Sequence, residues 1–131
     1  MGLKMRRQVA IPAGQHFGKI VNAEETSKTF DQKKGPEPVI EITIRPAYRV
    51  KGAETLDCSV IFTPVLNGIS ALSHLLERLE IDVPEGEYFD PKALVGMEVA
   101  FESGIFNDFV RIEKRSIQKR DGGKNQKLPV E

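Results

Sequence analysis

Residues 39–45, Val-Ile-Glu-Ile-Thr-Ile-Arg (VIEITIR), decide the fold class of this chain. Their three alternating isoleucines form the period-two pattern of a β-strand with one buried face. Similar alternating runs occupy residues 16–23 before this stretch and residues 56–62 after it, the latter joined to it by a hairpin-like turn at residues 51–54. A bulge or sheet corner is expected at Pro46, because proline cannot donate to a strand ladder. Three consecutive strands therefore open the predicted domain.

The segments between and after these strands differ from them in composition. Residues 26–38 are polar and contain three lysines and two prolines, which is typical of a long mobile loop. After Thr63-Pro64, leucines recur at spacings of three and four between Ile69 and Leu79. This stripe predicts an amphipathic helix, with Asn67 as its N-cap.

The last third of the chain predicts a short helix and two more strands. Asp90-Pro91 begins a one-turn helix, with the aspartate as cap and the proline in the first position, and Gly96 ends it. Residues 97–101 alternate as a fourth strand, and residues 109–117 form a less regular fifth strand.

The order of these elements points to one architecture. A β-sandwich needs about seven strands, whereas five antiparallel strands with a helix between the third and fourth match the OB type, a partly open Greek-key barrel. We predict a mainly β fold, a five-stranded OB-type Greek-key barrel over residues 11–118. A flexible basic N-terminus (1–10) and a basic disordered tail (119–131) are expected to flank it. A small α+β sheet with the helix across one face is the alternative.

Charge is balanced overall but uneven along the chain. The 131 residues carry 19 basic and 19 acidic side chains, which argues against a strongly basic type of nucleic-acid-binding protein. From Glu113 onward, however, six residues are positive and three are negative. Such a tail can hold a phosphate backbone, or it can be a solvated end without a partner.

Three segments of the chain match a known sequence pattern. They are the opening Ile11-Pro12-Ala13-Gly14 with Phe17 and IVNAE (20–24), the leucine-rich helix at 69–79, and FDPKALVGMEV (89–99). In these segments the chain resembles a family of small phage and prophage proteins, a domain of initially unknown function found in replication and recombination modules. The resemblance covers residues 11–117 and implies an OB-like fold that binds single-stranded DNA. It assigns no individual binding residue, and Pro46 departs from it.

Oligonucleotide-binding barrels of the OB type use the face of strands two and three and the loops joining strands one–two and four–five. In this chain those places hold cationic side chains, which can follow phosphates, and aromatic side chains, on which bases can stack. The candidate nucleic-acid-binding residues are Lys28, Phe30, Lys33, Lys34, Arg45, Tyr48, Arg49, Lys51, Phe106, Phe109 and Arg111.

These residues also have a structural interpretation. The three phenylalanines can pack against the barrel as core. Arg45 and Arg49 can pair across the strands with Glu41 or Asp57. Those two acids also lie in the middle of the expected binding face and repel phosphate, so contact is expected through loops and rim.

The sequence contains no signal for catalysis. There is no nucleophile elbow and no phosphate-binding loop, so we expect no enzymatic activity and no cofactor. The only cysteine, Cys58, is expected to be a buried small hydrophobic residue. With His16 and His74 far apart in the chain, no zinc site and no other metal site is expected.

The hypothesis is therefore non-enzymatic, sequence-independent binding of single-stranded DNA in phage or virus-like replication and recombination. RNA is the other strand type to test, and replication or recombination proteins are the expected partners. The alternative is a protein-interaction module, for instance a homodimer built on the strand edge beyond Pro46. No apolar run approaches the roughly 18 residues of a membrane span, so a cytoplasmic location in a prokaryotic cell is expected.

Overall fold

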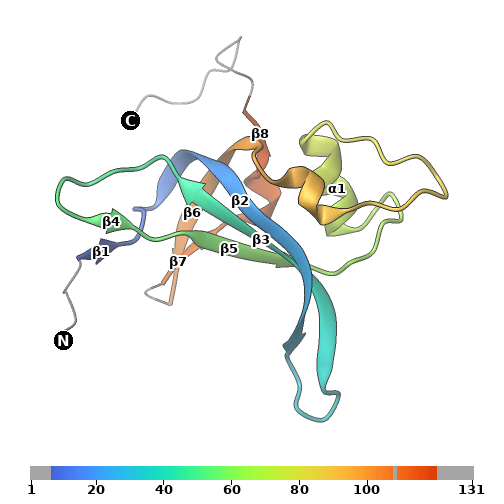
Figure 1. Ribbon diagram of the computed structural model, residues 1–131. Coiled ribbons are helices and arrows are strands. Elements are labelled where there is room, and N and C mark those ends of the chain that lie inside the picture. Colours follow the sequence, from blue (N-terminus) through green and yellow to red (C-terminus); the bar gives the residue numbers. More distant parts are fainter. Residues whose placement is uncertain (1–6, 108, 121–131) are drawn as a thin grey trace, which may run out of the picture.

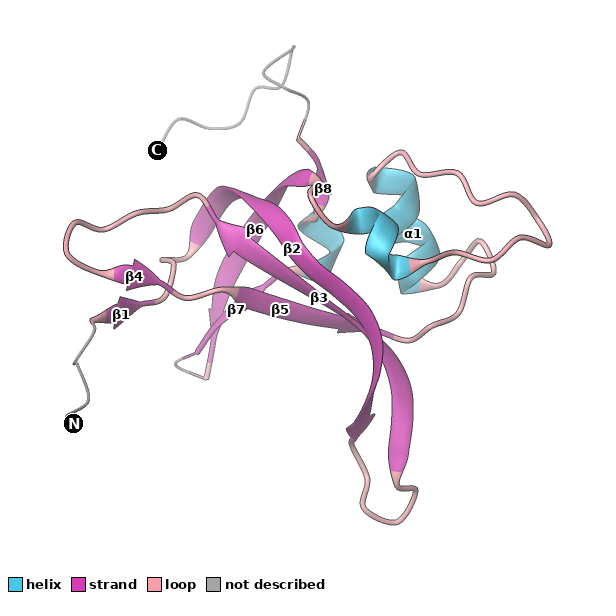
Figure 2. Cartoon of the chain, viewed as in Figure 1, coloured by secondary structure: helices cyan, strands magenta, loops and turns pink. Residues whose placement is uncertain are grey.

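The structure is a computed structural model that describes residues 7–107 and 109–120, with the backbone but not the side chain of Phe106. It is mainly β, as predicted, with α1 beside one end of a curved sheet (Figures 1 and 2). The helical elements are α1 (Ala71–Arg78) and the 3-10 turns η1 (Pro91–Leu94) and η2 (Lys114–Ser116). The strands are β1 (Gln8–Val9), β2 (Gly14–Thr29), β3 (Pro36–Pro46), β4 (Glu54–Thr55), β5 (Cys58–Phe62), β6 (Glu98–Phe106), β7 (Phe109–Ile112) and β8 (Gln118–Lys119).

Six strands form one antiparallel sheet in the order β5-β3-β2-β6-β7, with β8 paired to β6. β2 is the central strand, because residues 14–19 pair with β6 and residues 18–29 pair with β3. None of the strand pairs in the described part of the chain joins β5 to β7, so the hydrogen-bonded sheet is open. β1 and β4 form a separate two-stranded parallel pair.

Gly18 is the point at which β2 is paired with β3 and β6 at once. A β-carbon at this position would lie 2.8 Å from the Ile44 Cγ2 atom, 2.9 Å from the Arg45 carbonyl oxygen and 3.1 Å from the Phe101 ring. Strand interiors disfavour glycine unless another backbone approaches closely. Because Gly18 has no side chain, β3 and β6 can both pack closely against β2 at this position.

A β-bulge at Val21 changes which side chains of β2 face the core. The pairing with β3 shifts between Ile20 and Asn22. Before the bulge, His16, Gly18 and Ile20 are buried, as the alternation predicts, but after it Ala23 is buried and Asn22 is exposed. The extra residue inserted by a bulge also bends the strand, and Figure 1 shows β2 curving away from the sheet beyond this point.

The segment predicted as a mobile loop, residues 26–38, is instead mostly paired strand. β2 and β3 continue past the other strands as an antiparallel pair that extends to Thr29 and Pro36. We call residues 24–41 the hairpin arm (Figure 1). The loop prediction was wrong because Pro36 and Pro38 lie where β3 has no second neighbour, and proline is tolerated on a strand edge whose amide would face solvent.

α1 closes one end of the core with the leucine stripe predicted from the sequence. Leu72, Leu75 and Leu76 are buried in one cluster with the sheet isoleucines, including Ile42 and Ile44. The helix is also tied to the last strands, because Arg78 donates hydrogen bonds to two backbone carbonyl oxygens of residues 114–117.

The predicted start of the helix was wrong by three residues. Ser70, not Asn67, is the N-cap, and its hydroxyl accepts a hydrogen bond from the Ser73 amide at 3.1 Å. The Asn67 side chain instead accepts hydrogen bonds from the amides of Ile69 and Ser70 in the preceding turn. Ile69 therefore precedes the helix and its side chain is 79% exposed.

Two strand boundaries also differ from prediction. β3 ends at Pro46 and residues 47–53 form no strand, so the strand edge beyond Pro46 that the sequence suggested for a homodimer is absent. The fifth strand is shorter than predicted: β7 ends at Ile112, and η2 and β8 follow. The terminal segments predicted to be flexible lie mostly outside the described residues, and within them residues 8–9 form β1 while residue 119 ends β8.

Gly18→Ala is expected to lower the free energy of unfolding by about 1–3 kcal/mol, because the added methyl group overpacks the junction of three strands. Urea denaturation measures the change. Gly104→Ala is the matched control, since the nearest atom to its β-carbon would lie at 3.8 Å, an ordinary contact distance. Equal midpoints for the wild type and Gly18→Ala would contradict this account of the junction.

Candidate nucleic-acid interface

A groove of about 670 Å³ separates β5 from β7. Phe30, which directly follows β2 in the hairpin arm, and Lys114 of η2 also line it. We call it the β5–β7 groove, and its walls are formed by Cys58, Ser59 and Ile61 on one side and by Val110, Arg111 and Ile112 on the other.

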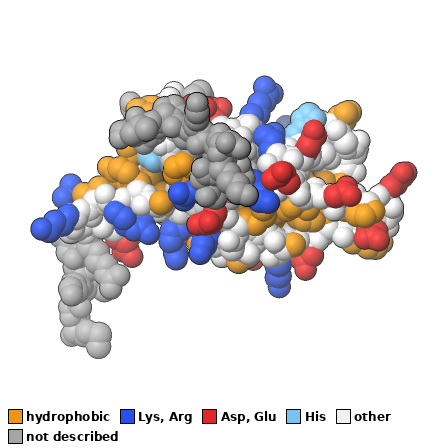
Figure 3. Space-filling model, turned by 90° about the horizontal axis from the view of Figure 1, so that it is seen from above, with side chains coloured by type: hydrophobic (Ala, Val, Ile, Leu, Met, Phe, Trp, Pro, Cys, Tyr) orange, Lys and Arg blue, Asp and Glu red, His pale blue; other side chains and the backbone are white. Residues whose placement is uncertain are grey.

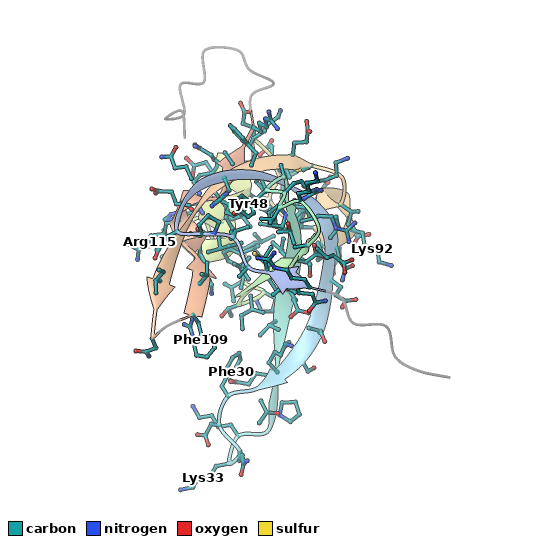
Figure 4. All side chains as sticks on the ribbon, turned by 90° about the vertical axis from the view of Figure 1, so that its left-hand side faces the viewer. Phe30, Lys33, Tyr48, Lys92, Phe109 and Arg115 are labelled. Carbon is teal, nitrogen blue, oxygen red and sulfur yellow. The ribbon has the colours of Figure 1, made fainter. Side chains whose placement is uncertain are left out.

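Two aromatic side chains are exposed at or beside this groove. Phe30 is 61% exposed and Phe109, next to Val110 of the groove wall, is 71% exposed. Figure 4 shows both rings at a similar height, below the body of the sheet and above the arm tip that carries Lys33. The interpretation of Phe109 as core is therefore wrong. The side chain of Phe106, another candidate, lies outside the described residues.

The three candidate lysines of the hairpin arm are exposed but not equivalent. Lys28 pairs with Glu41 of the neighbouring strand, with 3.3 Å between Nζ and Oε2. Lys33 and Lys34 lie in the turn at the arm tip, where the Asp31 carboxylate accepts a hydrogen bond from the Lys33 amide. Lys28 is thus partly neutralised, whereas the tip lysines extend into solvent.

Arg45 forms the cross-strand pair that the structural interpretation allowed. Its Nε and Nη2 atoms each donate a hydrogen bond of 3.2 Å to the two carboxylate oxygens of Asp57. The hydrogen bond and charge of Asp57 raise the pKa of Arg45. The guanidinium is therefore occupied by a carboxylate, and the acid on this face is neutralised by it.

Tyr48 and Arg49 have mainly structural contacts. Tyr48 is half-buried and packs edge-on against His16, with 5.9 Å between ring centroids. Arg49 donates from Nη1 to the carbonyl oxygens of Pro46 at 2.7 Å and of Tyr48 at 2.9 Å, which fixes its guanidinium over this loop. Lys51 is exposed in the turn before β4.

Sequence reasoning missed three cations that the fold brings to the surface near these residues. Lys114 lies over the Phe62 ring at 5.2 Å and lines the β5–β7 groove. Lys19 is exposed in the middle of β2, and Arg120 follows β8. Lys114 and Arg120 belong to the basic run that begins after Glu113, so the excess of positive charge in this segment could have pointed to them. Their contacts with Phe62 and Phe17 could not be predicted, because these contacts depend on how the sheet folds.

Cys58 is half-buried in the wall of the β5–β7 groove rather than fully buried as predicted. Burial raises the pKa of its thiol, and the negative charge of Asp57 raises it further. Both causes disfavour the thiolate, which is the reactive form. We therefore expect Cys58 to react more slowly at neutral pH than a fully exposed thiol.

On the face seen in Figure 3, the two ends of the molecule differ in the charge that prevails. Figure 3 shows Lys and Arg side chains gathered at the end with β1 and β4, and Asp and Glu side chains gathered at the end with α1. Residues 77–90 alone contain six acids and one arginine. A neutral protein with this separation still presents a positive field on one side.

Comparison with known proteins gives no family for this chain. No family model matches it, and a search of curated proteins finds no match. Within residues 7–107 and 109–120, no group of three or more His, Cys, Asp or Glu side chains is arranged to hold a metal ion. No helix in this part of the chain is long and apolar enough to cross a membrane.

Cys58 is expected to react with iodoacetamide along a pH profile shifted to higher pH than that of glutathione, because its raised pKa leaves less thiolate at any given pH. Asp57→Asn should move the profile partly back, since burial is the larger cause. Mass spectrometry of the alkylated protein at a series of pH values measures both. A profile that coincides with that of glutathione would contradict the burial of this thiol.

Proposed function

We propose that this protein is a non-enzymatic binding protein for single-stranded DNA and that its sheet is an OB-type barrel. In this proposal β2, β3, β5, β6 and β7 are the five strands, and α1 follows the third of them. β5 and β7, the two ends of the sheet order, line opposite walls of the β5–β7 groove. The groove is the proposed binding site.

The observation that carries the proposal is the exposure of Phe30 and Phe109 at or beside a groove that cations line. Large exposed aromatic side chains forgo the stabilisation of burial, and single-strand-binding proteins use such rings to stack bases. Arg111 and Lys114 line the same groove and can contact phosphates. This combination suits a flexible strand with accessible bases better than a duplex.

In this proposal the cations close to the groove attract the DNA, although the net charge of the whole protein is zero. The acidic residues 77–90 lie at the α1 end, whereas the proposed site lies between β5 and β7. Affinity should fall as salt rises, because bound cations on the DNA are released when lysines and arginines replace them. Replication or recombination of phage or prokaryotic DNA in the cytoplasm is the proposed setting, in keeping with the family that the sequence resembles.

Phe30→Ala and Phe109→Ala are each expected to weaken binding of a labelled ~30-nucleotide single strand by about 1–3 kcal/mol, the usual loss for one stacked base. Fluorescence anisotropy in low and then moderate salt measures the affinity. Tyr88→Ala is the control, because Tyr88 is fully exposed in the acidic loop. A wild-type protein that does not bind the single strand in low salt would refute the proposed function.

Asp57→Asn is expected to tighten binding, because it releases Arg45 for a phosphate and removes a negative charge beside the groove. The slope of log affinity against log salt should become steeper by about 0.7 for one added phosphate contact. Glu80→Gln is the control, since it removes a carboxylate from another surface pair, with Lys119 at 3.5 Å. Equal effects of the two substitutions would rule out this role for Arg45.

Self-association is the second candidate, and the hairpin arm favours it. Residues 21–29 of β2 have no strand partner on the side facing away from β3 among the described residues. An open strand edge of this kind can pair with another chain. Light scattering after size exclusion tests it: a dimer that persists in high salt, together with no affinity for single strands, would favour this candidate over the first.

A further inference from the structure

Three surface hollows follow one another around the end of the molecule that carries β1 and β4. The β5–β7 groove shares Leu56 and Asp57 with a second hollow, of about 630 Å³. That hollow shares Arg45 and Arg49 with a third, of about 330 Å³, on the outer side of β2 and β3. The shared residues place the three hollows next to one another on the surface.

The third hollow is cationic because of the register of the sheet. Lys19 is directly opposite Arg45 in the β2–β3 ladder, and on its other side it is opposite Glu98 of β6. Like charges directly opposite in a sheet are destabilising. Arg45 is compensated by Asp57, but Lys19 has no ion pair with any described residue, although Glu98 is its ladder neighbour.

Arg120 completes this row of charges from the far side of β6. Its amide donates to the Glu98 carbonyl oxygen at 3.0 Å, which holds the residue beside β6. Its guanidinium carbon lies 4.1 Å from the centroid of the Phe17 ring. Stacking on an aromatic face fixes the plane of a guanidinium and leaves its N–H edge free to donate to an oxyanion.

Arg49 supplies a further fixed charge to the same hollow. Its bonds go to two backbone carbonyl oxygens, so no carboxylate neutralises it within the described residues. Among the described residues that line this hollow, Lys19, Arg49 and Arg120 thus place three positive charges against one acid, Glu98. None of the described residues that line this hollow is a large exposed hydrophobic one, in contrast to the groove, where Phe30 is.

We propose that this third hollow is a second site for the same nucleic-acid strand and that it binds the phosphodiester backbone without contacting bases. A strand leaving the β5–β7 groove passes the neutralised Arg45–Asp57 pair, crosses the second hollow and reaches Lys19 and Arg120. This inference rests on the proposed function and extends it: the binding track turns around the β1–β4 end, so long strands gain contacts that short strands do not.

The test compares a short strand of ~8 nucleotides, within the range that one OB fold holds, with a long strand of ~30 nucleotides. Lys19→Gln and Arg120→Gln should each weaken binding of the long strand and reduce its salt slope by about 0.7. Binding of the short strand should not change. Lys92→Gln is the control, because it removes one exposed positive charge from η1 (Figure 4), and Lys19→Arg should retain wild-type binding.

The outcomes separate the two proposals. In one outcome the wild type binds both strands, but Lys19→Gln and Arg120→Gln weaken binding of the long strand no more than Lys92→Gln does. This result would refute the second site and leave the proposed site in the β5–β7 groove unaffected. If either variant weakens the short strand as much as the long one, the hollow is not a separate extension, and the inference is again refuted. If the wild type binds neither strand, both proposals fail together. Unchanged thermal midpoints exclude misfolding of the variants.

Discussion

At Gly18 the backbone of β2 lies against the Ile44 side chain and the Arg45 carbonyl of β3 and against the Phe101 ring of β6. This contact allows one strand to pair on both sides over residues 18–19, which lie in both ladders. The row of charges formed by Arg45, Lys19 and Glu98 exists only because the two ladders meet there. A wider spacing at Gly18 would separate these side chains and would also loosen the wall of the core.

The bulge at Val21 then bends β2 just after this junction. The pairing of β2 with β6 ends at Lys19, just before the bulge, and the backbone of Ile20 instead exchanges hydrogen bonds of 2.8 and 2.9 Å with Gly96 and Met97. The segment that holds η1 is thereby attached to the middle of β2, while β2 and β3 are free to continue as the hairpin arm. Phe30 owes its position in the lining of the β5–β7 groove to this departure from the sheet, since it directly follows the last residue of β2.

Several elements could be predicted because their signal is local. The alternation in VIEITIR and the leucine spacing of α1 reflect burial of one face, and both are present in the structure. The hairpin arm was missed because its prolines and lysines resemble a loop, although proline suits a strand edge. The Arg45–Asp57 pair was one of two pairings left open, because residues 12 apart meet only through the register of β3 and β5. The exposure of Phe109 and the stacking of Arg120 on Phe17 likewise depend on contacts between distant segments.

The two prolines of the hairpin arm limit how copies of this chain could join. Pro36 and Pro38 deprive the outer edge of β3 of two amide donors, so a further strand cannot add there with a complete ladder. The outer edge of β2 in the arm has no such block. Because the arm has one competent edge, pairing of copies through the arm ends at a dimer: the two β2 edges pair with each other and neither remains open. An arm with two competent edges would instead permit head-to-tail addition without closure, and hence fibres.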